Sequence, residues 1–454
     1  MKIFFVSLGC DKNLVDTEKM LGILNGSGFE ITDDEDSADV VIVNTCCFIH
    51  DAKQESIETL LEYAQMKSEG NLKYLIAAGC LAQRYKDEII KEIPEVDAVI
   101  GTYACGEIAD VINRLNDRCR VYTSDSGNKQ PGRKRLRSSI SHYSYLKIAE
   151  GCDKHCTYCI IPSIRGSYRS FEMDELEAEA RDLADNGVNE LILVAQETTL
   201  YGTDIYGRKA IGELIDRLCA IDGIEWIRLM YCYPEEIGDE IINAFKKHPK
   251  MCRYIDMPIQ HISDRILKAM GRKTNKAQII DIIERLRKEL PDIVIRTSLI
   301  TGFPGETDEE HKELVDFVKD VKLERVGVFT YSKEENTPAA KMKGQVPRAV
   351  KNKRRKELML AQQEVVFEKN RMLAGKTFRV MIDGMISEPD AFETFISDED
   401  DDMKVYVART YMDAPDIDGS VFVLSRREII SGSLTNVIIE GYNGYDLIGH
   451  EIIK

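Results

Sequence analysis

The sequence predicts an α/β fold in three units: an open parallel α/β domain, an incomplete parallel barrel of six βα units, and a small antiparallel β-barrel. Short apolar, β-rich runs alternate with helix-like stretches in the first ~120 residues and again from about residue 143, the pattern of parallel α/β sheets. After residue 375 the expected strands are short and follow one another at turn spacing, which indicates a small all-β unit. A chain of 454 residues is long enough for about three domains.

The first unit, residues 1–120, is expected to form an open sheet with helices between its strands. The expected strands are 2–8, 40–43, 75–78 and 98–100, and the expected helices are 14–24, 51–66 and 84–92. Residues 121–142 include a stretch of Ser, Gly, Asn, Pro and basic residues that no core-forming period explains. We interpret this segment as a linker.

The second unit, residues 143–340, repeats the alternation of strand and helix. The expected strands are 145–149, 191–195, 226–231, 254–258, 294–299 and 326–331, with helices at 171–186, 211–220, 264–270, 276–290 and 308–321. Six such units predict an incomplete TIM-like barrel, in which chemistry takes place at the C-terminal ends of the strands.

The third unit follows a basic helix. Residues 341–374 are expected to form this connecting helix, and ten Lys or Arg residues against three Asp or Glu residues in 341–371 suggest a solvated face. Residues 375–446 are expected to form a small, OB-like β-barrel with strands at 378–386, 391–396, 405–407, 420–424 and 437–442. Turn signals are present at Asp383-Gly384 and Asp418-Gly419.

Composition narrows the class of protein. No apolar run approaches ~18 residues and the N-terminus lacks a basic n-region, so we expect neither a membrane span nor a secretory signal. We therefore expect a cytoplasmic protein. In the cytosol the twelve cysteines would stay reduced, so clustered ones are first read as metal ligands or catalytic groups. The net charge of −17 argues against a dominant sequence-independent grip on nucleic acid.

The strongest motif is Cys152-Asp-Lys-His-Cys156-Thr-Tyr-Cys159, directly after the first strand of the second unit. Three thiolates in eight residues can hold a cubane cluster and leave one of its four irons open to chelate a substrate. Zinc is the alternative, but it usually takes four ligands, and no second pair of ligands is evident nearby.

A second group of cysteines is spread along the first unit. Cys10, Cys46 and Cys80 each fall at the end of an expected strand, and strand C-terminal ends are where ligands bind in open α/β sheets. The alternative is that they are small buried apolar residues. Cys47 should point away from Cys46, because adjacent residues on a strand point to opposite faces. Only one of the two should reach the site easily, and periodicity alone cannot decide which one. The others, which have no ligand-like spacing and are expected to be structural, are Cys105, Cys119, Cys219, Cys232 and Cys252.

The motif C-x₃-C-x-aromatic-C, with Tyr158 as the aromatic residue, resembles the hallmark of the radical S-adenosylmethionine superfamily. The resemblance implies that Cys152, Cys156 and Cys159 hold a [4Fe-4S] cluster whose open iron binds S-adenosylmethionine, which is cleaved to methionine and a 5′-deoxyadenosyl radical. Candidate contacts to S-adenosylmethionine, each with a structural hydrogen bond as its alternative, are Tyr158, Gln196, Glu197 and Arg296.

The order of the three units resembles the methylthiotransferases, in which the last domain is a TRAM domain. Residues 7–16, Ser-Leu-Gly-Cys-Asp-Lys-Asn-Leu-Val-Asp, resemble the RimO branch, as do 159–166, 254–261 and 411–419, whereas the tRNA-modifying branch shows Gln-Met-Asn after the first cysteine. The resemblance implies a second [4Fe-4S] cluster on Cys10, Cys46 and Cys80 that carries the sulfur to be transferred. The family pattern Asn-Thr-Cys implies that Cys46 is the ligand and that Cys47 is only its neighbour. The implied product is a methylthio group on the β-carbon of an aspartate in ribosomal protein S-twelve.

The implied partners are ribosomal protein S-twelve, free or in the small ribosomal subunit, a reductase or flavodoxin/ferredoxin electron donor, and a sulfur source. Residues 376–446 carry six Lys or Arg and fifteen Asp or Glu, a net charge of −9 that suits a basic protein better than phosphates. The run 398–402 could instead be a solvated loop. Two alternatives are a tRNA methylthiotransferase of the MiaB type, expected to carry a basic last domain, and a non-catalytic iron-sulfur nucleic-acid-binding module.

Overall fold

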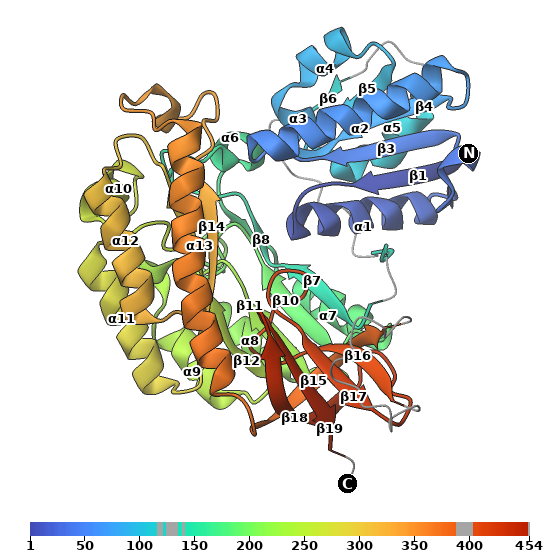
Figure 1. Cartoon of the computed structure of the whole chain (residues 1–454). Coiled ribbons are helices and arrows are strands. Elements are labelled where there is room, and N and C mark those ends of the chain that lie inside the picture. Colours follow the sequence, from blue (N-terminus) through green and yellow to red (C-terminus); the bar gives the residue numbers. More distant parts are fainter. Residues whose placement is uncertain (116–120, 124–134, 139–140, 387–402, 453–454) are drawn as a thin grey trace.

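The computed structural model describes residues 1–115, 121–123, 135–138, 141–386 and 403–452, which build two parallel sheets and one closed barrel (Figure 1). The predicted α/β fold class is confirmed. Among the described residues, no helix is both long and apolar enough to cross a membrane. The acidic run 398–402, the expected strand 391–396 and Cys119 lie outside the described residues.

The first sheet has the strand order β2-β1-β3-β4-β5-β6, and all its pairs are parallel. Its strands are β1 Lys2–Ser7, β2 Glu30–Ile31, β3 Val40–Thr45, β4 Tyr74–Ala78, β5 Val96–Ile100 and β6 Val121–Tyr122. Its helices are α1 Asp11–Gly26, α2 His50–Ser68, α3 Gly79–Arg84, α4 Lys86–Glu92 and α5 Ile108–Asn113. Alternate residues of β3 face opposite cores: Val41 packs with α2, α3 and α4, and Ile42 packs with α1 and α5.

The segment expected to be a linker is partly structural. β6 joins the first sheet beside β5. Arg135 is buried and forms ion pairs with Glu18 of α1 and Glu179 of the second unit, at 2.9 Å for Glu179. A buried charge in these contacts ties the two units together, which composition could not indicate.

The second sheet runs β7-β10-β11-β12-β13-β14 in chain order and is parallel throughout. Its strands are β7 Tyr143–Lys147, β10 Glu190–Val194, β11 Trp226–Leu229, β12 Met251–Asp256, β13 Val294–Thr301 and β14 Arg325–Thr330. The helices on its outer face are α7 Met173–Asp185, α8 Ile211–Cys219, α9 Asp239–Lys247, α10 Asp264–Ala269, α11 Lys276–Glu289 and α12 Asp308–Val321. Six strands that do not close on themselves form the expected incomplete barrel.

Helix α13, Arg348–Arg371, runs along the second unit toward the last domain (Figure 1). The solvated basic face that we expected is present, with Lys353 and Lys356 exposed, but another face packs on β14 and α12. Leu358 on that face is buried, and the buried Arg354 pairs with Glu306 at 3.1 Å and Asp308 at 2.7 Å. Some of its positive charge is therefore neutralised inside the protein.

The C-terminal unit is a closed barrel with the order β15-β16-β17-β19-β18. Its strands are β15 Thr377–Met385, β16 Lys404–Arg409, β17 Val421–Ser425, β18 Leu434–Asn443 and β19 Asp446–Glu451. It is antiparallel except for the β17–β19 pair, and β19 continues past residue 446, where we expected the domain to end. The turn signal at Asp383-Gly384 is wrong, whereas the expected strand 378–386, which contains both residues, is confirmed: they lie within β15, at an irregularity in its pairing with β16.

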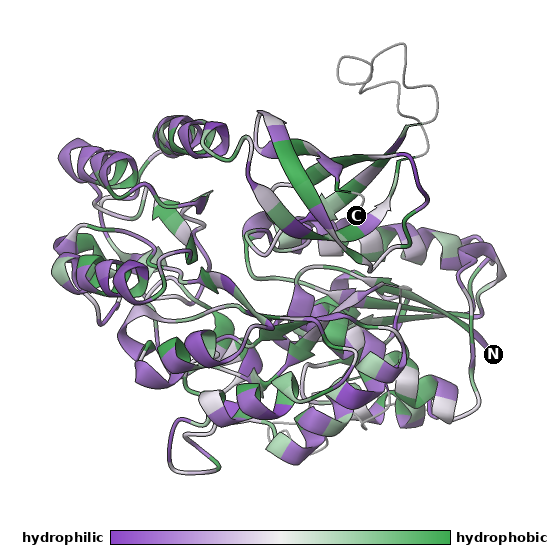
Figure 2. Ribbon diagram, turned by 90° about the horizontal axis from the view of Figure 1, so that it is seen from below, coloured by the Kyte–Doolittle hydropathy of each residue, from purple (hydrophilic) through white to green (hydrophobic). Residues whose placement is uncertain are grey.

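The C-terminal barrel packs against the inner face of the second sheet. Ile192 and Val194 of β10 share one apolar cluster with Val380 and Ile382 of β15. Figure 2 shows hydrophobic stretches in the strands, whereas the helices carry many hydrophilic residues. The contact also buries Glu190, which accepts from Arg228 at 2.9 Å and from Arg409 at 2.7 Å.

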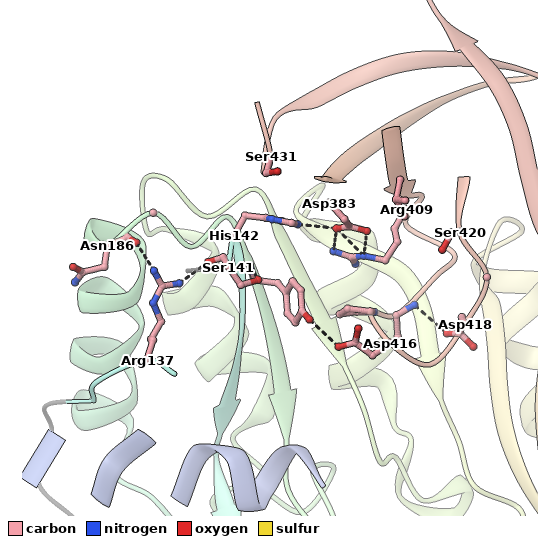
Figure 3. A pocket seen from close by; sticks show the side chains of 16 residues that line it. Arg137, Ser141, His142, Asn186, Asp383, Arg409, Asp416, Asp418, Ser420 and Ser431 are labelled. Carbon is pink, nitrogen blue, oxygen red and sulfur yellow. Dashed lines mark hydrogen bonds and ion pairs between the residues drawn. The ribbon is translucent and has the colours of Figure 1, made fainter. Parts of the chain in front are cut away.

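A cavity of about 660 Å³ lies at the junction of these two units (Figure 3). Asp383 lines it and is held by Arg409 at 2.9 Å and by the His142 ring at 2.8 Å, which explains why this Asp-Gly pair sits in a strand rather than a turn. The cavity lies where β7 begins, so it is at the opposite end of the sheet from the strand C-termini that carry the cysteines.

Candidate functional site: two groups of cysteines that face each other

The first group is Cys10, Cys46 and Cys80. They follow the C-terminal ends of β1, β3 and β4, which are neighbours in the first sheet. Two glycines pack the chain around Cys46: a Cβ on Gly9 would lie 2.6 Å from the Cβ of Cys46, and a Cβ on Gly79 would lie 2.2 Å from Oδ1 of Asn44. The residues just before Cys10 and Cys80 therefore touch the segment that ends at Cys46.

Cys46 and Cys47 differ in their surroundings. Cys46 packs on Gly9, whereas Cys47 is fully buried in the apolar cluster that includes Leu60 and Leu81. Burial raises the pKa of the Cys46 and Cys80 thiols, and it raises the pKa of Cys47 to about 12. Cys46 thus lies beside the residue that precedes Cys10; that Cys46 rather than Cys47 is the ligand stays a prediction.

Gly79→Ala should disrupt this arrangement. Gly79 has φ +91°, which costs an L-residue about 1–2 kcal/mol, and its new Cβ would collide with Asn44 and with the carbonyl of Thr45. The matched control is Gly28→Ala, with φ +85° and open space around the Cβ, so it carries the backbone strain without the collision. We expect Gly79→Ala to lower the urea midpoint and the bound iron clearly more than Gly28→Ala does; equal effects would show that the close approach at Gly79 is unimportant.

The second group, Cys152, Cys156 and Cys159, lies in a loop between the short strand β8, Ala149–Glu150, and helix α6, Ile161–Arg165. Backbone hydrogen bonds fix this loop: Cys152 N donates to Gly166 O at 3.1 Å, and Thr157 N donates to Met270 O at 2.9 Å. Burial raises the pKa of Cys152 to about 11 and that of Cys159 to about 12. Iron would therefore have to displace protons from these thiols on binding.

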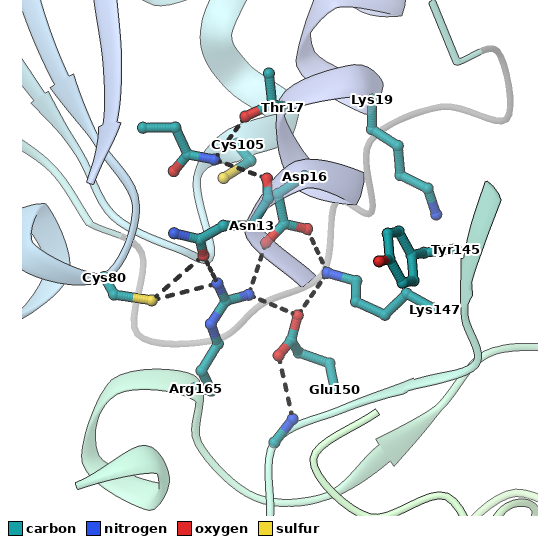
Figure 4. Close-up of polar contacts among 12 residues, drawn as sticks. Asn13, Asp16, Thr17, Lys19, Cys80, Cys105, Tyr145, Lys147, Glu150 and Arg165 are labelled. Carbon is teal, nitrogen blue, oxygen red and sulfur yellow. Dashed lines mark hydrogen bonds and ion pairs between the residues drawn. The ribbon is translucent and has the colours of Figure 1, made fainter. Parts of the chain in front are cut away.

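Arg165 connects the two groups (Figure 4). It is the last residue of α6, six positions after Cys159, and its Nη2 lies 3.3 Å from the Sγ of Cys80. Its other amino group pairs with Asp16 of α1 at 2.6 Å and with Glu150 at 3.0 Å. α3 and α6 contact each other as well. The first group and the loop that carries the second group therefore share one buried cation.

A buried network continues from Arg165 and is drawn in Figure 4. Lys147 pairs with Asp16 and, at 2.7 Å, with Glu150, whose other oxygen accepts from Gln196 Nε2 at 2.9 Å. Burial alone would raise the pKa of Glu150, but Arg165 and Lys147 outweigh it and hold that pKa well below its usual range. Sequence reasoning missed Asp16, Lys147 and Glu150, because no local pattern links residues so far apart.

The loop after β11 touches both groups. Tyr231 Oη donates to Asp11, the neighbour of Cys10, at 3.2 Å, and the Lys12 ammonium lies 3.0 Å from the centre of the Tyr231 ring. Two residues later, Tyr233 Oη lies 3.8 Å from the Sγ of Cys156. Three consecutive residues thus span from one cysteine group to the other.

Three cysteines in each group are donors of the kind that a cubane cluster takes. Within the described part of the chain, no three His, Cys, Asp or Glu side chains are close enough together to hold one metal ion. A cubane takes one cysteine at each of several separate irons and so tolerates wider spacing. Two groups of three cysteines, mostly buried and with cations close to them, are suitable donors for two such clusters.

The four residues predicted to contact S-adenosylmethionine have different environments. Gln196 and Glu197 follow the end of β10; Gln196 Oε1 and Glu197 Oε2 have no hydrogen-bond partner in the described structure, and burial raises the pKa of Glu197 to about 7. Tyr158 packs against the apolar cluster around Phe303. Arg296 lies early in β13 and pairs with Asp256 at 2.6 Å. Arg296 also lies 3.8 Å from Asp418 of the C-terminal unit, and all four contacts remain predictions.

Three family models match the chain. Residues 2–101 match the Uncharacterized protein family UPF0004, residues 146–318 match the Radical SAM superfamily, and residues 374–452 match the TRAM domain. These matches coincide with the first sheet, most of the second unit and the C-terminal barrel.

Curated relatives match over nearly the whole chain. The chain is 54% identical over 451 residues to the "Ribosomal protein uS12 methylthiotransferase RimO" of Lachnoclostridium phytofermentans, covering 99% of both chains. It is 50% identical to the protein of the same name from Acetivibrio thermocellus, covering 99% of this chain and 98% of the relative, and 45% identical to that of Clostridioides difficile, with the same coverage.

Among solved structures, the radical S-adenosylmethionine methyltransferase TsrM from Kitasatospora setae is similar in fold. Its complex with tryptophan and a cofactor analogue superimposes with a TM-score of 0.54 at 14% identity and covers 72% of each chain. Its form with cobalamin and a [4Fe-4S] cluster gives 0.53 at 16% identity, covering 74% of this chain and 73% of that one. This likeness concerns the arrangement of the elements.

Proposed function

The chain belongs to the RimO family of ribosomal protein uS12 methylthiotransferases, and from this premise we propose that it adds a methylthio group to the β-carbon of an aspartate in uS12. The observation that carries the proposal furthest is the placement of two cysteine groups, joined by Arg165 and by residues 231–233, so that one substrate can meet both.

We assign Cys152, Cys156 and Cys159 to the cluster that binds S-adenosylmethionine, and Cys10, Cys46 and Cys80 to a second cluster. Membership of the radical SAM superfamily supports an iron-sulfur cluster and S-adenosylmethionine as cofactors; the second cluster is our proposal. When bound, the clusters would supply the electron that cleaves S-adenosylmethionine and the sulfur that is transferred.

The role of the protein is to hold the source of the radical and the source of the sulfur at a fixed separation. An unactivated C–H bond has no acidic proton for a base, so the radical and the sulfur must reach the same carbon in turn. Arg165, Lys147, Asp16 and Glu150 form a buried ion network between the loops that carry the cysteines. Such a network resists rearrangement because breaking one of its pairs leaves a buried charge unpaired.

Substrate would enter beside the first group. Cys10 is exposed, and so are Phe48 and Ile49, which follow Cys46 and Cys47. Of the other five cysteines in the two groups, all except Cys159 are at most 7% exposed. An opening at Cys10 with buried thiols behind it would admit an extended protein loop while keeping bulk water from the reacting groups.

The remaining partners follow from the same proposal. The reaction requires an electron donor, for which a reductase or a flavodoxin or ferredoxin is suited, and a source of sulfur. The substrate is uS12, free or in the small ribosomal subunit, and the place of action is the cytoplasm. The net charge of −17 favours a basic protein substrate over RNA.

A deletion strain tests the substrate. Mass spectrometry of its ribosomal proteins and of its tRNA should show uS12 lighter by one methylthio substituent and tRNA unchanged. Complementation with the chain restores the uS12 mass, and complementation with Cys10→Ala does not. Loss of the methylthio group from tRNA with normal uS12 would instead identify a tRNA methylthiotransferase of the MiaB type, and no loss from either would support a non-catalytic module.

A further inference from the structure

Arg272 is a buried cation next to the second cysteine group. It is 8% exposed and follows α10, where Met270 O accepts from Thr157 N of the cysteine loop. One amino group of Arg272 lies 4.0 Å from the Sγ of Cys156, and the other donates to Pro258 O at 2.8 Å. Its guanidinium carbon lies 4.2 Å from the centre of the Tyr233 ring.

Arg272 differs from the other buried cations near the cysteines because, in the part of the chain that the structure describes, it forms no ion pair with a carboxylate. Arg165 and Lys147 each pair with Asp16 and Glu150. Lys154 pairs with acidic side chains of the same region: Glu197, Glu235 and Glu236. Within the described residues no carboxylate oxygen lies within 4.0 Å of Arg272, and its Nε has no hydrogen-bond partner. A buried charge that forms no ion pair is costly unless another anion lies close to it; Glu235 attracts Arg272 only from beyond ion-pair distance, whereas the Cys156 sulfur lies 4.0 Å away.

We propose that Arg272 is the counter-ion of the cluster on Cys152, Cys156 and Cys159, and that it positions this cluster through the sulfur of Cys156. This inference rests on the proposed function, which supplies the cluster. Three thiolates make the site anionic, and the amino group nearest Cys156 provides the matching positive charge and an N–H donor to its sulfur.

The surroundings keep the guanidinium in place. Stacking on Tyr233 and the hydrogen bond to Pro258 restrict it to one orientation, and Tyr233 itself lies 3.8 Å from Cys156. Arginine stays charged under all relevant conditions, so the positive charge does not depend on pH. Because hydrogen bonds and charge near the sulfurs set a cluster's potential, Arg272 should also make this cluster easier to reduce.

The test compares iron-loaded and iron-free forms of the whole chain carrying Arg272→Met, a variant of similar length without the charge. Loss of Arg272 should reduce the gain in Tm on loading by several degrees, weaken retention of iron against a chelator by about 10- to 100-fold, and lower the midpoint potential of the S-adenosylmethionine-responsive cluster. The iron-free variant should be at least as stable as the iron-free wild type, since a buried charge that forms no ion pair has been removed. Arg272→Lys should recover part of each property.

The matched control is Arg265→Met on α10, the helix that precedes Arg272. Arg265 is exposed and pairs with Glu310, so its loss should leave the loading gain, the iron retention and the potential unchanged. Equal loss of Tm in the loaded and iron-free forms of Arg272→Met would overturn the proposal in favour of a structural role. Unchanged iron retention and potential with weaker S-adenosylmethionine binding would overturn it in favour of a contact to the carboxylate of that molecule. The gain in Tm, the iron retention and the midpoint potential can all be measured without turnover of uS12. Failure of the proposed function would therefore be seen separately, in the product assay.

Discussion

Replacing Cys152, Cys156 and Cys159 together with alanine should remove about four of about eight bound irons and abolish reductive cleavage of S-adenosylmethionine. The loss is expected to be complete because the open iron of that cluster is the proposed binding point for S-adenosylmethionine. The corresponding change at Cys10, Cys46 and Cys80 should also remove about four irons but should leave cleavage of S-adenosylmethionine intact. Iron analysis and quantification of 5′-deoxyadenosine measure the two effects independently.

A control variant uses cysteines without ligand-like spacing. Cys105, Cys219 and Cys252 changed together to alanine should keep both the iron and the cleavage activity, because they lie within the packed parts of the two sheets. Unchanged iron content in the Cys152, Cys156 and Cys159 variant would contradict the cluster assignment, and loss of iron in the control would show that iron retention reports only on folding.

Arg165→Met should have the second largest effect. Arg165 is 2% exposed and joins Asp16, Glu150 and Cys80, so its removal leaves two buried carboxylates with Lys147 as their one remaining cation in the network. Loss of one partner from a buried ion network costs about 3–5 kcal/mol. We expect the free energy of unfolding to fall by about this amount in urea titrations, together with loss of iron from the first cysteine group.

Arg169→Met, at the start of β9 and four positions after Arg165, provides the comparison. Arg169 is half-buried, stacks on Tyr103 at 5.2 Å and donates to Ser167 O, and no ion pair of Arg169 is found in the described part of the chain. Its loss should change stability by less than about 1 kcal/mol. If the two variants have the same stability and iron content, the Arg165 network does not hold the two groups together.

The parts of the site that follow from local sequence were predictable. In a parallel sheet the C-terminal ends of neighbouring strands meet at one edge, so cysteines after β1, β3 and β4 had to come together. The loop 152–159 is a continuous motif, and its position after the first strand of the barrel followed from the strand pattern. Hydrophobic periodicity also separated the two sheets and placed most of their strands.

The connections between the two groups were not predictable. That the partners of Arg165 are Asp16, 149 residues away, and Glu150 depends on how two separately folded units dock. Lys147 and Asp16, which also pair, are 131 residues apart in the sequence. Such contacts leave no periodic signal, because each involves single residues on different elements.

Local turn chemistry misled at Asp383-Gly384 for a related reason. The dipeptide favours a tight turn, yet Arg409 and His142 hold the Asp383 carboxylate within β15. β6 and the bridge pair β8 with β9, Arg169–Ser170, are two residues long and too short for any periodicity to appear. Tertiary contacts therefore decided the structure where the local signal was weak or opposed to them.

The most direct test of the account is the mass of uS12 after incubation with the purified, anaerobically reconstituted chain, a reductant, sulfide and S-adenosylmethionine. The account predicts that one aspartate-containing peptide gains the mass of a methylthio group in place of one hydrogen, and that neither three-cysteine variant produces it. A tRNA substrate in the same mixture should stay unmodified. Methylthiolation of tRNA, or modification of uS12 by either cysteine variant, would contradict the account.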